Sequence, residues 1–221
     1  MGHHMERAKT SYWKKRLGAL EKQLIANHFD VYAAESAAGA QQIVREDILA
    51  KTQAKSVSWG GSRTLMATGL VGELKNHSTL TVIDAFENNI TREESMERRR
   101  QAFRVDLYLT GCNAITETGL LVNLDRTGNR VAALTFGPRY VVVLVGRNKI
   151  VPDLAAAMNR IKNLAAPLNA MRLAKATPCA KTAVCQDCKG HDRLCNTWTI
   201  TEKSLPSGRI KVILIDDELG F

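Results

Sequence analysis

The sequence predicts an α/β protein with a mainly parallel β-sheet, a mixed β meander and a small metal-binding loop near the C-terminal end. Apolar runs alternate with helical stripes through the first hundred residues, which is typical of a parallel sheet covered by helices on both faces. After Val105 the apolar runs are separated by Gly, Asn and Pro, which adds antiparallel pairing. Four cysteines then gather within residues 179–195.

The length and composition are those of a globular chain. It has 221 residues, of which 45% are hydrophobic and 24% charged, so disordered, collagen-like and disulfide-scaffold classes are excluded. No apolar run reaches the roughly 20 residues that span a bilayer, and no secretory signal begins the chain. We expect a cytoplasmic protein with one domain over 11–221. Residues 1–10 are expected to be an extension that starts with a tag remnant, Met1-Gly-His-His-Met5.

The charge balance predicts an anionic partner. The chain holds 31 Lys and Arg against 22 Asp and Glu, a formal net charge of +9, which attracts anions of several kinds. Aromatic residues make up only 5%, and no nucleic-acid stacking motif or Cys2His2 finger occurs. We therefore expect a small phosphorylated or carboxylated metabolite, or an acidic protein, in preference to nucleic acid, and no membrane association.

Two helices and a strand open the chain. Apolar residues at spacings of three and four, among them Trp13, Leu17 and Leu24, predict an amphipathic helix over 11–28. The same spacing predicts a second helix over 36–49. A short extended run at 30–34 is expected to be the first strand.

The next segment predicts two further strands and two helices. A strand over 54–59 leads into glycines and then into a helix that begins near Leu65. A β-branched, apolar run over 79–85 predicts a buried strand. Thr91 and Glu94 fit a capping box, which opens a highly charged helix that ends near residue 104.

The second half predicts mostly strands. Pro152 stands at a good first-turn position, and the apolar stripe that follows it predicts a helix over 154–165. Thr127-Gly-Asn-Arg130 is expected to be a hairpin turn. Strands are expected at 106–110, 120–124, 131–136, 140–145, 197–203 and 209–215.

The cysteine segment, over 177–198, is the strongest chemical signal. Its spacing is Cys179-x5-Cys185-x2-Cys188-x6-Cys195, on a short polar loop. Four thiolates can surround one metal centre, because soft sulfur ligands suit zinc or an iron–sulfur cluster. Two disulfides or four free thiols are the alternatives, and disulfides are disfavoured in the cytosol.

The spacing favours a [4Fe–4S] cluster over zinc. Zinc ribbons usually contain two Cys-x2-Cys knuckles, and this loop contains one, at Cys185 and Cys188. The irregular gaps are closer to those of cluster loops. His191 lies within the loop and is an alternative ligand, although a solvated histidine is the commoner outcome.

A glycine loop predicts an anion site. Gly60 and Gly61 follow a strand and precede a helix, where free backbone N–H groups favour phosphate or carboxylate. Ser62, Arg63 and Thr64 add donors. An ordinary strand-to-helix turn is the alternative. The loop lacks the G-x-G-x-x-G fingerprint, so no flavin or nicotinamide motif is present.

A polar stretch, Gly111-Cys-Asn-Ala-Ile-Thr-Glu-Thr-Gly119, supplies further candidates. It follows a predicted strand, and ligands gather beyond the carboxyl ends of strands in open α/β sheets. Asn113, Thr116 and Thr118 are therefore expected to bind ligand, and Glu117 to act as base, nucleophile or ligand anchor. A polar connection without a ligand is the alternative. Cys112 is expected to be a buried, inert thiol rather than a reactive one.

Three segments together resemble the LUD-domain, or lactate utilization protein, family. They are Ser58-Trp-Gly-Gly-Ser-Arg-Thr64, Gly111-Cys-Asn-Ala-Ile-Thr-Glu-Thr-Gly-Leu-Leu-Val-Asn123 and Val145-Gly-Arg-Asn-Lys-Ile-Val-Pro152. The four-cysteine tail, which ends Arg193-Leu-Cys-Asn-Thr-Trp198, resembles that of a subgroup of this family.

The resemblance implies both a fold and a function. The fold would be similar to the NagB, ribose-5-phosphate isomerase and CoA-transferase-like superfamily, with a Rossmann-like sheet. The function would belong to bacterial lactate oxidation, in which family members work with iron–sulfur or other redox subunits. The superfamily also suggests a second function, because Glu117-Thr-Gly119 is similar to the nucleophile segment of class I CoA-transferases.

Two functions therefore compete. The first is a cytoplasmic redox protein of the lactate-utilization type that binds a small anionic metabolite and carries an iron–sulfur cluster. The alternative is a non-redox enzyme acting on acyl-CoA compounds or phosphosugars through Glu117, with a structural zinc loop. A metabolite sensor or nucleic-acid-binding module is a third class.

Overall fold

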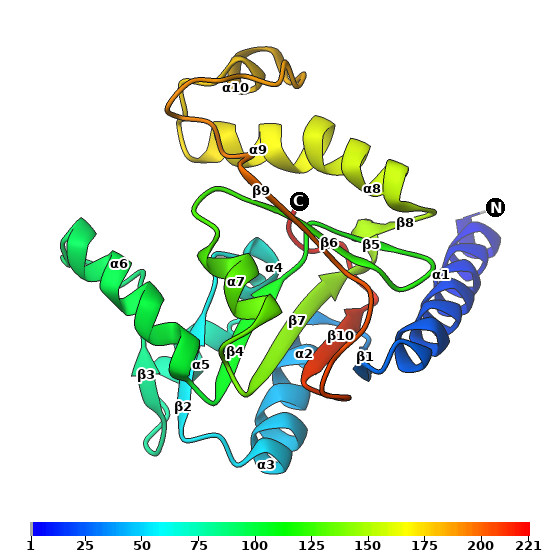
Figure 1. Cartoon of the computed structure of the whole chain (residues 1–221). Coiled ribbons are helices and arrows are strands. Elements are labelled where there is room, and N and C mark those ends of the chain that lie inside the picture. Colours follow the sequence, from blue (N-terminus) through cyan, green and yellow to red (C-terminus); the bar gives the residue numbers. More distant parts are fainter. Residues whose placement is uncertain (1) are drawn as a thin grey trace.

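Six parallel strands form the main sheet of the computed structural model, which describes residues 2–221 and the side chains from His4 onward (Figure 1). Their order is β1-β10-β7-β4-β2-β3, and every pair is parallel. The bounds are β1 Asp30–Ala34, β2 Ser56–Trp59, β3 Thr81–Ile83, β4 Leu107–Gly111, β7 Tyr140–Gly146 and β10 Ile210–Ile215. The predicted parallel sheet is confirmed.

A smaller mixed sheet stands above the carboxyl ends of these strands (Figure 1). Its order is β8-β5-β6-β9, with β5 pairing antiparallel to β6 and parallel to β8, and β6 antiparallel to β9. The bounds are β5 Ala114–Thr116, β6 Leu121–Asp125, β8 Ile150–Val151 and β9 Thr197–Thr201. The predicted mixture of parallel and antiparallel pairing therefore belongs to a separate sheet.

The helices cover both faces of the main sheet. Successive residues of β7 point to opposite faces. Val141 and Val143 pack with Leu24 of α1 and Leu134 of α7. Val142 and Leu144 belong to the opposite core, which α2, α4 and α5 complete. The bounds are α1 Gly2–Ala26, α2 Ala37–Ile43, α3 Leu49–Thr52, α4 Arg63–Ala67, α5 Leu70–Lys75, α6 Arg92–Gln101 and α7 Asn129–Thr135.

A long helical segment carries the cysteines. Helix α8 (Leu154–Arg160) continues through the π-helical turn Ile161–Ala165 into α9 (Ala166–Arg172). Its residues Ala157 and Ile161 pack against Ala114 and Val122 of the smaller sheet. A short helix, α10 (Pro178–Thr182), then begins the cysteine segment above α9 (Figure 1). The segment is thus attached to the smaller sheet through α8 and α9.

The predicted strand over 131–136 is wrong, because this segment is helix α7. Gly128 has a φ of 89° and precedes the first turn, so the predicted hairpin at 127–130 is instead the start of the helix. A short apolar run does not distinguish a strand from a buried helix. The tertiary structure decides between helix and strand here, because the apolar residues of α7 are buried against the sheet face formed by β7.

Several other boundaries also differ. Helix α1 begins at Gly2 rather than at residue 11, since no proline or other helix breaker intervenes. Strands β5 and β8 and helix α10 are too short to leave a periodic pattern, and the sequence does not predict them. Thr91 caps α6 as predicted, whereas the side chain of Glu94 pairs with Arg98 instead of reaching back to the cap.

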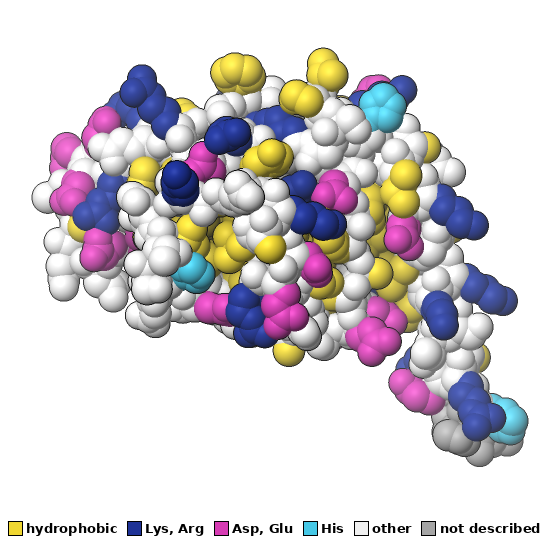
Figure 2. Space-filling view, turned by 90° about the horizontal axis from the view of Figure 1, so that it is seen from below, with side chains coloured by type: hydrophobic (Ala, Val, Ile, Leu, Met, Phe, Trp, Pro, Cys, Tyr) yellow, Lys and Arg dark blue, Asp and Glu magenta, His cyan; other side chains and the backbone are white. Residues whose placement is uncertain are grey.

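The surface shows no concentration of one charge on the side seen from below in Figure 1. Figure 2 shows that Lys and Arg side chains alternate there with Asp, Glu and hydrophobic side chains. No helix in the described part of the chain has the length and apolar character needed to cross a membrane.

Candidate functional site

The direction in which successive strands are added to the main sheet reverses between β2 and β4. From β2 the chain continues to β3 on one side, and from β4 it continues to β7 on the other. Ligands bind at such a switch point, beyond the carboxyl ends of the strands. Here β2 ends before Gly60-Gly61 and β4 ends at Gly111. The structure therefore brings the glycine loop and the start of the polar stretch together.

Glycine is required at this point because the two segments approach closely. A Cβ added to Gly111 would stand 2.5 Å from Ser62 Oγ and 3.2 Å from the backbone oxygen of Leu144. Ser62 cannot move freely, because its hydroxyl accepts a hydrogen bond of 3.2 Å from the backbone N–H of Leu65 and caps α4. A Cβ on Gly60 would likewise stand 2.7 Å from Tyr108 Oη.

Replacing Gly111 by Ala is expected to lower the free energy of unfolding by about 1–3 kcal/mol, the usual cost of overpacking a core. Urea unfolding of the purified variant measures the change. The control is Gly72→Ala in α5, where an added Cβ meets nothing within 4 Å and alanine favours the helix. Equal stability of the two variants would contradict the close approach.

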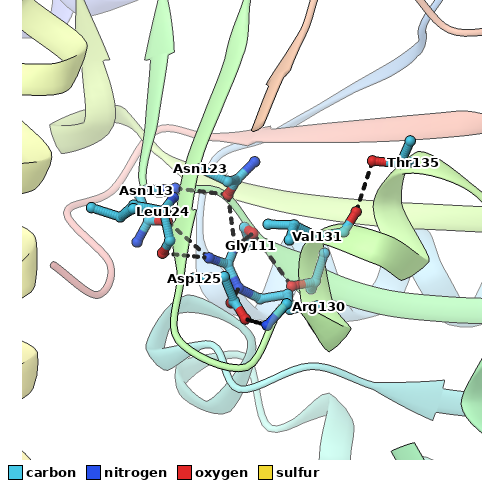
Figure 3. Close-up of polar contacts among 10 residues, drawn as sticks. Gly111, Asn113, Asn123, Leu124, Asp125, Arg130, Val131 and Thr135 are labelled. Carbon is cyan, nitrogen blue, oxygen red and sulfur yellow. Dashed lines mark hydrogen bonds and ion pairs between the residues drawn. The ribbon is translucent and has the colours of Figure 1, made fainter. Parts of the chain in front are cut away.

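Arg130 ties the polar stretch to the smaller sheet. It is 8% exposed and extends from α7 into the space between Gly111 and β6 (Figure 3). Its guanidinium donates to Asp125 Oδ1 at 2.9 Å, Gly111 O at 3.1 Å, Asn123 Oδ1 at 2.6 Å, Asn113 Oδ1 at 2.9 Å and Leu124 O at 3.2 Å. The Asn113 side-chain oxygen, a predicted ligand group, is thus engaged in holding the strands.

Lys149 is the main site residue that the sequence patterns do not indicate. It is 4% exposed, and its Nζ donates to Thr64 Oγ1 at 2.7 Å and to the Cys112 carbonyl at 3.0 Å. Burial lowers the pKa of Lys149 to about 8; the Cys112 thiol opposes this shift, and Arg160 and Arg130 add to it. In the sequence it is only a lysine that follows the apolar run at 140–145, which does not distinguish a buried lysine from a solvated one.

Cys112 lies beside this lysine. Its side chain is buried, and burial raises the pKa of the thiol although Lys149, Arg130 and Arg160 lower it. A buried thiol with a raised pKa forms little thiolate at neutral pH, so its environment matches the predicted inert cysteine.

The last residues of the chain cover Thr64. The Thr64 hydroxyl donates to the Leu219 carbonyl at 2.9 Å, and Asn148 bonds the backbone of Leu219 and Gly220, each at 3.2 Å. A Cβ on Gly220 would stand 2.7 Å from Thr64 Oγ1. The chain near residue 220 therefore lies against the glycine loop.

The turn that carries Glu117 faces helix α1. The Glu117 carboxylate pairs with Arg16, and the Thr118 carbonyl accepts from Asn27 at 3.0 Å. Thr116 is buried, and its hydroxyl bonds that of Thr118 at 2.8 Å. Within the described residues, no hydrogen bond joins this turn to the glycine loop. The predicted site residues thus divide into two groups.

A second arginine stands near the glycine loop. Arg63 is exposed at the start of α4, and Arg172 is exposed at the end of α9. Burial lowers the pKa of Arg172, and the positive charge of Arg63 lowers it further. The two cations are therefore close enough to repel, and among the described residues neither has a carboxylate partner.

The cysteine segment places all four predicted thiols around one pocket. Cys179, Cys185, Cys188 and Cys195 line it, together with Lys162 and Arg193 among others. Asp187 Oδ1 accepts from Lys162 at 3.0 Å and from Arg193 at 2.8 Å. Arg193 also donates to the carbonyls of Cys188 and Cys195. These contacts hold the segment against the π-helical turn that follows α8.

The thiols are not arranged as a formed metal centre. Among the described residues, no group of three or more His, Cys, Asp or Glu side chains has the geometry to hold a metal ion. Burial raises the pKa of the Cys195 thiol, Lys162 and Arg193 oppose that shift, and the thiols of Cys185 and Cys179 add to it. The donor set, four soft sulfur atoms around one pocket, fits zinc or an iron–sulfur cluster.

Comparisons with known proteins identify the family. The LUD domain model matches residues 17–215. The chain is also similar to the crystal structure of a DUF162 family protein from Deinococcus radiodurans, with 15% identity and a TM-score of 0.53, over 92% of this chain and 98% of that one. At this identity the likeness shows the fold alone. No curated protein matches the chain. Because the family model spans most of the sequence, the chain belongs to the LUD domain family.

Proposed function

We propose that this LUD-domain protein is a cytoplasmic redox protein of the lactate-utilization type. It carries a [4Fe–4S] cluster on the cysteine segment and binds a small anionic metabolite beside the glycine loop. The observation that carries the proposal is the position of four thiols around one pocket. The proposal also assigns the chain to the LUD-domain subgroup that has a four-cysteine tail.

The surroundings of the pocket suit a cluster. Four thiolates give a cubane cluster a net negative charge, and Lys162 and Arg193 lie at the pocket to offset it. When bound, the cluster accepts and releases one electron at a time. Cys179, Cys185, Cys188 and Cys195 would hold it, and the bonds of Arg193 to two of their carbonyls keep the loop near the pocket.

The charge of the same region suits an acidic redox partner. Residues 154–196 contain two acidic residues, Asp187 and Asp192, and both are paired with basic side chains. The basic residues of this range are Arg160, Lys162, Arg172, Lys175, Lys181, Lys189 and Arg193. A positive surface steers an acidic partner, so iron–sulfur or other redox subunits are the proposed neighbours in electron transfer.

Metal analysis tests the proposal. Protein purified without oxygen should contain about four iron and four sulfide per chain and show a cluster absorbance that bleaches on reduction. Zinc without iron or sulfide would contradict the redox role and leave a structural zinc loop. Protein that stays metal-free after reconstitution with iron and sulfide would contradict both the redox role and a structural zinc loop.

The alternative acyl-transfer enzyme depends on Glu117. In the structure this carboxylate is paired with Arg16. Among the described residues, no hydrogen bond joins it to the glycine loop. A carboxylate held by an arginine is a weaker nucleophile. We therefore expect Glu117→Gln to leave iron content unchanged and to weaken metabolite binding only modestly, because glutamine keeps the shape and part of the hydrogen bonding.

Mass spectrometry checks this expectation after incubation with a panel of acyl-CoA compounds. Wild-type protein should show no acyl adduct on Glu117. The exposed Glu46, which pairs with Arg45, provides a matched control as Glu46→Gln. An adduct that appears on wild type and disappears in Glu117→Gln would establish the nucleophile and the acyl-transfer function.

A further inference from the structure

Lys149 differs from every other buried charged side chain of the described residues. Asp84 pairs with Lys75 at 2.6 Å, Arg130 with Asp125 at 2.9 Å and Lys211 with Asp30 at 2.9 Å. Arg209 donates to the carbonyls that end α7. Each of these groups has an opposite charge or the negative end of a helix beside it.

Lys149 has neither. Its two hydrogen bonds go to the hydroxyl of Thr64 and the carbonyl of Cys112, which are neutral acceptors and use two of its three protons. No carboxylate of the described residues lies within ion-pair distance of it. A buried charge without a counter-charge is costly, and buried groups perturbed in this way cluster at functional sites.

Other cations lie near Lys149 or near its partner Thr64. Arg160 lies near Cys112 and Lys149 and donates to the carbonyls of Asn113 and Asn148 at 2.8 and 3.2 Å. Arg63, next to Thr64 in the chain, is exposed, and its charge acts on the exposed Arg172. None of the three has a carboxylate partner among the residues that the structure describes. No carboxylate in the described part of the chain therefore compensates this positive charge.

We propose that a ligand carboxylate or phosphate supplies this counter-charge by binding Lys149 and Thr64 at the carboxyl ends of the strands. This inference rests on the anionic-metabolite site proposed above. It adds that Lys149 anchors the metabolite and that the metabolite carries a carboxylate or phosphate. The third proton of the Lys149 ammonium bonds a ligand oxygen, and Arg63 and Arg172 attract the anion from solvent. Because Leu219 and Gly220 cover Thr64, binding displaces that segment.

Calorimetric titration of the full chain tests the anchor. The probes are lactate, malonate and inorganic phosphate at constant ionic strength. We expect Lys149→Met to weaken binding of whichever probes bind by about 10- to 150-fold, the fold-change of one charge-assisted hydrogen bond. The matched control is Lys211→Met, which removes another buried lysine of comparable exposure, at the opposite end of the sheet, and should leave anion affinity unchanged.

A measurement on the wild-type protein keeps the test independent of how the variant folds. The ε-carbon NMR signal of Lys149 should titrate near 8 in the free protein, and its pKa should rise when phosphate saturates the site, because a bound anion favours the charged amine. Adding phosphate at constant pH should leave the Lys211 signal in place, because Lys211 lies at the opposite end of the sheet. The pattern across the three probes then distinguishes a monocarboxylate from a dicarboxylate or a phosphate.

The proposal that Lys149 anchors the anion would be overturned by either of two results. One is unchanged anion affinity in Lys149→Met, and the other is wild-type protein that binds none of the probes. These outcomes are distinguishable from failure of the proposed redox function, because iron and sulfide are measured on the same preparation. Iron-replete protein without anion binding would reject the anchor and leave the cluster standing. If the wild-type protein contains no iron but binds an anion, and Lys149→Met loses that binding, the anchor is supported and the redox function is not.

Discussion

Replacing Arg130 by Met is expected to lower the free energy of unfolding by about 3–5 kcal/mol, the usual cost of removing one partner from a buried ion pair. The substitution leaves the Asp125 carboxylate without its cation. It also leaves four other oxygens, of Gly111, Asn113, Asn123 and Leu124, without this donor (Figure 3). Since a domain has only about 5–15 kcal/mol of stability, the loss is a large fraction of the total.

Urea unfolding followed by circular dichroism measures the effect. Arg139→Met is the matched control, because Arg139 is 73% exposed and stands 3.6 Å from Asp106. An exposed pair of this kind contributes about 0–1 kcal/mol. A loss for Arg130→Met no larger than that of the control would show that the network does not hold the two sheets together.

Cys185→Ser is expected to abolish metal binding and to release residues 177–198 from their position above α9. Metal binding supplies about 10–16 kcal/mol of ordering free energy in small structural zinc sites, and this segment buries little apolar surface that could replace it. Limited trypsin digestion should therefore cut the variant at Lys181 and Lys189, both exposed in the structure, while the main sheet stays intact.

Cys112→Ala is the control for that experiment, because Cys112 is buried beside Lys149, outside the cysteine segment. It should keep the metal content and the resistance to trypsin of the wild type. If the segment of Cys185→Ser resists trypsin as well as that of the wild type and keeps the same metal, the four cysteines do not share a metal site.

The candidate site was only partly predictable from the sequence. The glycine loop and the start of the polar stretch each follow a strand, and the parallel sheet brings strand ends together, so their meeting was foreseeable. Lys149 was not, because nothing local distinguishes a buried lysine from a solvated one. Glu117 belongs to the same polar stretch as Asn113, yet the turn after β5 directs it to Arg16 of α1.

Local patterns in the sequence determined the strand alternation, the cap of α6 and the clustering of cysteines, since each depends on neighbours within a few residues. The tertiary structure alone decided that 129–135 is a helix and that Lys149 has no counter-charge among the described residues. Both depend on groups far apart in the chain. Helix α7 is stabilised by packing its apolar residues against the sheet face that carries Val141 and Val143. Lys149 is buried where it bonds Thr64 and Cys112, and the segment near Leu219 covers Thr64.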